Sequence, residues 1–127
     1  MSSADAPDVR GFSLISAAGR IGIGIGMLAA PELSLRALGF SQVDQATVTV
    51  GRIAGVRDLV LGIATVAALD DPARLRTASL ANATADAGDA MAFGVALGSK
   101  ERTAGIRGMA AALPAAVAGI WVSWRLS

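Results

Sequence analysis

Apolar residues dominate four stretches of the chain, each of about 20 residues, and short polar segments separate them. The pattern predicts helices over residues 12–30, 45–69, 75–97 and from about 105 to 125, each long enough to cross a lipid bilayer. A shorter amphipathic segment, 31–40, follows the first helix and carries leucines around Glu32 and Arg36. We expect it to lie at the membrane interface and to end at Gly39.

The connections between the long helices are short and polar. Residues 70–74, DDPAR, predict a tight turn that makes helices 45–69 and 75–97 antiparallel neighbours, and residues 98–102, GSKER, form the last turn. An even number of spans places both termini on one side of the membrane. The sequence therefore predicts an all-α fold with a single domain, 1–127, built as an antiparallel four-helix multi-pass bundle in the cell membrane.

Composition supports lipid as the surroundings. The chain is 54% hydrophobic and 17% charged, with a mean hydropathy of +0.57. In soluble domains, about a quarter of all residues are charged. The alternative is a soluble, alanine-rich four-helix bundle. Against it, the last apolar stretch carries Arg107 as its only charge between 105 and 124, and a surface helix in water needs a polar face.

The residue inventory narrows the chemistry. With no Cys and no His, thiol nucleophiles, haem ligation by His and nearly all zinc or iron sites are excluded, so we expect no metal and no cofactor. A net charge of +1 without a basic stripe argues against nucleic acid as a partner. Carboxylates, guanidinium groups, hydroxyls and amides remain for any reaction.

Ionisable residues stand at the centres of three apolar stretches. Arg20 lies in the first, Arg57 and Asp58 in the second, and Asp86 and Asp89 in the third. A charge at the bilayer midplane costs at least a few kcal/mol, so such residues face the bundle interior and pair with one another. We therefore predict that the three helices bring these five residues to one buried site.

Each long helix also has one face of small or polar residues, which we expect to point inward. These faces comprise Ser13, Ser16, Arg20, Gly24 and Met27; Gly51, Gly55, Asp58 and Gly62; Ala78, Asn82, Asp86, Asp89 and Phe93; and Gly105, Ala112, Ala116, Gly119 and Ser123. The glycine and alanine stripes allow close helix packing and also permit a homodimer.

The central charges suit acid–base chemistry without histidine. Two arginines face three aspartates, so the excess negative charge predicts that one carboxyl keeps its proton. Asp86 and Asp89 lie one turn apart and are the expected acid and base, Asn82 is expected to hold a water, and Phe93 and Met27 are expected to contact substrate. An Asp–Arg–Asp arrangement with a nearby amide resembles, in residue types only, that of limonene-type epoxide hydrolases, which are soluble and have another fold. The alternative is that the charges only neutralise one another and fix helix register, and Asp58 is the member that best fits this structural role.

Three segments resemble a family of small four-helix membrane proteins of bacteria and fungi, most of which have no assigned activity. The segments are GRIAGVRDLVLGIA (51–64), LAAPELSLRALGF (28–40) and ADAGDA (85–90). Fungal relatives in polyketide biosynthesis are assigned as epoxide-opening enzymes. The resemblance implies Arg57, Asp58, Asp86 and Asp89 as site residues.

We therefore expect a membrane-embedded, cofactor-independent epoxide hydrolase or cyclase whose lipophilic substrate enters from membrane lipid. Two alternatives remain: a small proton-coupled transporter, or a non-catalytic membrane subunit or scaffold with structural ion pairs. A dead-end polar cavity favours the enzyme, a water path to both faces favours transport, and extensive helix contact with another protein favours the scaffold.

Overall fold

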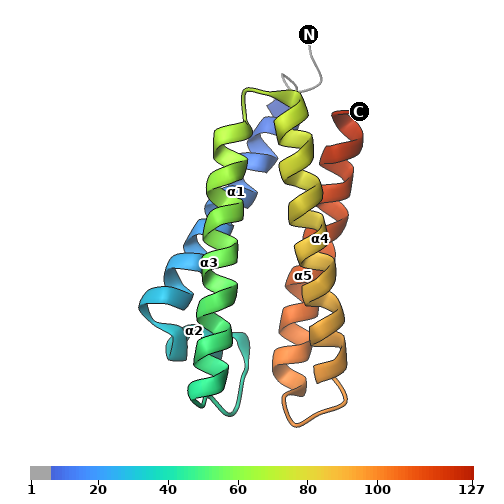
Figure 1. Cartoon of the computed structure of the whole chain (residues 1–127). Coiled ribbons are helices and arrows are strands. Elements are labelled where there is room, and N and C mark those ends of the chain that lie inside the picture. The colour runs from blue at the N-terminus through green and yellow to red at the C-terminus, as the bar shows by residue number, and fades with distance from the viewer. Residues whose placement is uncertain (1–6) are drawn as a thin grey trace.

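The computed structural model describes residues 7–127, which form five helices and no strand. They are α1 (Pro7–Ala29), α2 (Pro31–Leu38), α3 (Gln45–Ala68), α4 (Pro72–Ala96) and α5 (Arg102–Arg125). Four long helices lie lengthwise beside one another, and the short α2 lies at one end next to α3 (Figure 1). The predicted all-α class and the short helix after the first long one are confirmed.

Local chemistry explains where the helices begin and end. Asp44 and Asp71 precede α3 and α4, and each side chain accepts a hydrogen bond from a backbone N–H of the first turn. The predicted turn at 70–74 is too long, because α4 already begins at Pro72. Proline suits the first position of a helix, where its missing N–H would have no partner in the helix. Gly39 ends α2 as predicted: it has a left-handed φ of 109°, and its N–H donates to the last carbonyls of that helix.

The long helices associate as two pairs. Helix α1 packs along α3, and α4 packs along α5, whereas contact between α3 and α4 is much less extensive. Helices α3 and α4 are antiparallel and joined by a tight turn, as predicted, but each has its main partner elsewhere (Figure 1). The beginning of α1 and the end of α5 lie at the same end of the molecule as that turn.

Glycines allow the backbones within each pair to approach closely. A Cβ added at Gly62 would lie 2.7 Å from Cγ1 of Ile21 and 2.9 Å from the carbonyl oxygen of Ala17, and one at Gly55 would lie 2.7 Å from Cβ of Met27. These contacts fix the register of α1 against α3 and set Arg20 opposite Asp58. The predicted glycine face of α3 is confirmed, since its members are buried.

Apolar packing is concentrated at the two ends of the molecule. The cluster at the α3–α4 turn comprises Val9, Ala68, Leu69, Leu75, Val122 and Leu126. The cluster beside α2 comprises Met27, Leu35 and Val48. Large apolar side chains instead cover much of the outside, with Ile15 74% and Val95 81% exposed. Helices α1 and α5 are long enough and apolar enough to cross a membrane. Helices α3 and α4, which carry the central aspartates, do not meet the same test of length and apolar composition.

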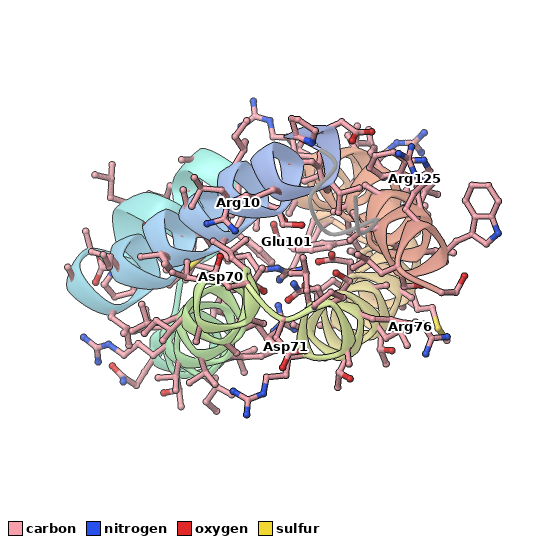
Figure 2. The ribbon with its side chains drawn as sticks, turned by 90° about the horizontal axis from the view of Figure 1, so that it is seen from above. Arg10, Asp70, Asp71, Arg76, Glu101 and Arg125 are labelled. Carbon is pink, nitrogen blue, oxygen red and sulfur yellow. The ribbon has the colours of Figure 1, made fainter. Side chains whose placement is uncertain are left out.

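Polar contacts also connect the two pairs at their ends. Arg10 of α1 forms an ion pair with Asp70 in the α3–α4 turn (Figure 2), and Arg125 of α5 forms one with Asp8. At the opposite end, the carboxylate of Glu101 accepts hydrogen bonds from the loop that precedes α3. Between these ends, the middle of the molecule holds the charged residues.

Candidate functional site

The five central charged residues form one connected network. Arg20 donates from Nη1 to Oδ1 of Asp58 at 2.9 Å and from Nη2 to Oδ2 of Asp86 at 2.5 Å. Arg57 donates to both carboxylate oxygens of Asp89 at 2.7 Å and to Oδ1 of Asp58 at 3.1 Å. The prediction that helices 12–30, 45–69 and 75–97 bring these charges together is confirmed.

The network runs from the interior toward the surface of the bundle. The side chains of Arg20, Asp58 and Asp86 are about one-tenth exposed, whereas those of Arg57 and Asp89 are 35% and 30% exposed. Arg20–Asp86 and Arg57–Asp89 both join the α1–α3 pair to α4. Charged hydrogen bonds therefore connect the two helix pairs in the middle of the molecule.

The pairing of the acids differs from the expectation. Asp86 and Asp89 do not bond each other: Asp86 reaches Arg20 on α1, and Asp89 is held by Arg57 on α3. Residues three apart on a helix point about 60° away from each other, which suffices to give the two carboxylates different neighbours. The Asp–Arg–Asp unit is instead Asp58–Arg20–Asp86, and Asp58 is shared by both arginines.

A small, partly open cavity of about 20 Å³ lies beside Asp86, which is one of its lining residues. Hydroxyl and amide side chains from three helices line it: Ser13 and Ser16 of α1, Thr65 of α3, and Ser79 and Asn82 of α4. That volume is enough for about one water molecule, which needs several polar partners. The cavity therefore has the size and the lining of a site for a single bound water.

The amide of Asn82 is fixed so that its oxygen is left for such a water. Its Nδ2 donates to Oγ1 of Thr65 at 3.0 Å, and that hydroxyl donates onward to the carbonyl oxygen of Leu61 at 2.8 Å. Oδ1 of Asn82 and Oγ of Ser13 are buried and have no partner among residues 7–127. A buried polar atom without a partner costs about 1–3 kcal/mol, which a water in the cavity would offset.

Two predicted substrate contacts lie elsewhere. Met27 packs in the apolar cluster with Leu35 and Val48, and the ring of Phe93 covers Gly108, where an added Cβ would come within 2.4 Å of it. Neither side chain lines the cavity. Met27 and Phe93 share a helix face with the charged residues, as predicted. Their bulky side chains instead fill space inside or next to a helix pair, so they do not reach the site.

Sequence reasoning missed two of the polar residues that line the cavity, Thr65 and Ser79. Thr65 lies seven positions after Asp58 on α3, and Ser79 lies seven positions before Asp86 on α4. A spacing of seven returns to almost the same side of a helix. Extending the polar faces by two turns would have found both residues.

Carboxylates and guanidinium groups carry the chemistry of this site. In the part of the chain that the structure describes, no three acidic side chains gather in a way that could hold a metal ion. Comparisons with known family models, with curated proteins and with solved structures find no match to this chain. The chemistry of the site is therefore the basis for a proposed function.

Proposed function

We propose that this chain is a multi-pass membrane protein whose buried site opens lipophilic epoxides. The apolar exterior supports the membrane part of the proposal. All four long helices expose large apolar side chains, among them Ile15 and Ile23, Val50 and Ile53, Met91 and Val95, and Val117 and Ile120. This holds also for α3 and α4, because their aspartates point inward and leave an outer surface suited to lipid.

The Asp58–Arg20–Asp86 unit beside a one-water cavity carries the enzymatic part. Asp86 and Asn82 both line the cavity, so a water there lies next to a carboxylate base and an amide acceptor. Arg20 holds both aspartates in place through charged hydrogen bonds. These residue types match the Asp–Arg–Asp arrangement of limonene-type epoxide hydrolases on an unrelated fold.

The proposed reaction has three linked changes. Asp86 takes a proton from the water, the water oxygen forms a bond to an epoxide carbon, and the bond from that carbon to the ring oxygen breaks. A protonated Asp58 gives its proton to the departing oxygen, and the product is a diol. When a hydroxyl of the substrate replaces water, the same steps give a cyclic ether.

The position of Asp58 in the network favours it as the acid. Two arginines and three carboxyls are neutral together when one carboxyl holds a proton, which a low-dielectric interior favours. Oδ1 of Asp58 accepts from both arginines, and its Oδ2 accepts no hydrogen bond within residues 7–127, so Oδ2 is the oxygen left to hand a proton to the substrate. Asp89 is less suited, because Arg57 occupies both of its oxygens.

The shape of the interior supports an enzyme over a proton-coupled transporter. Between the cavity and the α3–α4 turn lie Val9, Leu75 and Val122, which are almost completely buried. This apolar packing closes the cavity toward that end of the molecule. A polar cavity closed toward one end does not form a water path between both ends of the molecule, and it suits a reaction in which one water is consumed in each turnover.

The test is an assay of purified protein in nanodiscs with a panel of lipophilic epoxides in ¹⁸O-labelled water. We expect diols that carry one ¹⁸O atom, and loss of their formation in Asp86→Asn. The matched control is Asp70→Asn, because Asp70 is an exposed aspartate in a surface ion pair with Arg10. Absence of diols across the whole panel, or equal turnover in Asp86→Asn, would refute the proposal.

A further inference from the structure

A second hollow, on the outside of the bundle, lies between α3 and α4 and has a volume of about 610 Å³. Its lining is almost entirely apolar: Leu61, Ala64 and Ala67 come from α3, Ala78 and Ala81 from α4, and Arg74 stands near the turn. The hollow exists because these two helices contact each other little and face each other with alanines. Its size is within the range of sites for small organic molecules.

The two ends of this groove differ in chemistry. At the end near the turn, the side chain of Arg74 is 77% exposed and pairs through Nε with Asp71 at 3.3 Å. Its two terminal nitrogens bond no group in the range 7–127. These two nitrogens can form the paired hydrogen bonds that a guanidinium group makes with a carboxylate.

The other end of the groove leads to the reactive residues. Leu61 lies one helical turn after Arg57, and Ala81 is next to Asn82 in the chain. Thr65 and Asn82, which line the water cavity and bond each other, directly follow the groove residues Ala64 and Ala81 in the chain, so the groove and the cavity are neighbours. Arg57 and Asp89, the partly exposed end of the network, lie beyond the groove on the same two helices.

We infer that this groove binds the hydrocarbon chain of the substrate, and that the substrate is a long-chain epoxy carboxylic acid whose carboxylate pairs with Arg74. The inference rests on the proposed function. Arg74 and Asn82 are eight positions apart on α4, which is about 12 Å along a helix. The carboxylate and the epoxide must be separated by a comparable length of chain, so the epoxide lies within the chain and away from the head group.

Binding of an unreactive ligand tests the groove independently of catalysis. Stearate would displace a fluorescent fatty acid from the protein in nanodiscs of zwitterionic lipid. Arg74→Gln should weaken stearate binding about tenfold, as expected for loss of one charge-assisted hydrogen bond. The matched control is Arg76→Gln, because Arg76 lies on the side of α4 away from α3 (Figure 2) and does not line the groove.

Filling the groove tests where the chain lies. Ala64→Leu and Ala81→Leu place larger side chains at exposed lining positions, and both should weaken binding of stearate and of methyl stearate. The control is Ala110→Leu, at an exposed position of α5 outside the groove. If Ala64→Leu instead changes the oligomeric state and leaves stearate binding intact, the groove is an interface between two copies and the inference is overturned.

Kinetics with three epoxides separate this inference from the proposed function. For 9,10-epoxystearate, Arg74→Gln should raise KM about tenfold and leave kcat unchanged, while the methyl ester and styrene oxide should be unaffected. Stearate binding that depends on Arg74 without opening of any epoxide would refute the proposed function and keep the groove. Opening of all three epoxides with no effect of the groove variants would refute the groove and keep the function.

Discussion

Replacing Asp86 with Asn separates a catalytic from a structural role for the network. In the native protein, Arg20 donates to Oδ2 of Asp86 at 2.5 Å, and the amide oxygen of an Asn at this position can accept the same hydrogen bond. The substitution also removes one of the three carboxyl groups, which leaves two aspartates and two arginines. Arg20 keeps Asp58 as its ionic partner.

The expected magnitudes follow from these contacts. Because the hydrogen bond is kept, and because loss of the proton proposed on Asp58 lets two carboxylates face two arginines, the free energy of unfolding should fall by no more than about 1 kcal/mol. Loss of the base should lower turnover by about 10²–10⁴-fold, roughly 3–5 kcal/mol of barrier. Arg20→Gln is the contrasting variant: it leaves Asp86 buried without a cation, which can cost about 3–5 kcal/mol of stability.

The assay combines diol formation with thermal unfolding of both variants in the same nanodiscs. We expect Asp86→Asn to be stable and inactive, and Arg20→Gln to be both unstable and inactive. If Asp86→Asn unfolds as readily as Arg20→Gln, the aspartate has a structural role. If Asp86→Asn retains native turnover, it is not the base and the proposed mechanism is wrong.

Three further predictions concern the fold. Gly62→Ala should destabilise the protein by roughly 1–3 kcal/mol, because the added Cβ would lie 2.7 Å from Cγ1 of Ile21. Gly22→Ala, which has open space around it, should instead stabilise the protein by about 0.5–1 kcal/mol. Thermal unfolding measures both changes, and equal effects would contradict the close-approach argument. Backbone and side-chain hydrogen bonds from Ser41 lower the pKa of Glu101 below 4.5, so its contacts are present above about pH 4.5 and are lost as pH falls through the lowered pKa. The protection of the Ser41 amide against hydrogen exchange, measured relative to its intrinsic exchange rate at each pH, should therefore fall on acidification. Glu101→Gln should abolish this pH dependence, and an unchanged protection profile would argue against the contact. Alkaline carbonate should leave the protein in the membrane fraction, and its release into the supernatant would contradict membrane insertion.

Hydrophobic periodicity determined the helices, because burial of apolar residues and the geometry of helix ends are local properties. The sequence predicted the all-α class and the stop at Gly39, whose left-handed φ a glycine adopts easily. It also predicted that the central charges meet, since isolated charges in an apolar interior are too costly. Boundaries near Pro7 and Pro72 were misplaced because proline at a helix start was treated as part of a loop.

Only the tertiary structure decided which charge pairs with which. The face of a helix gives the direction of a side chain, but its partner depends on which helix packs there and in what register. Close approach at Gly24, Gly55 and Gly62 pairs α1 with α3 and places Arg20 beside Asp58. The resulting Asp58–Arg20–Asp86 unit joins residues 38 and 66 positions apart, a combination that no local pattern in the chain contains.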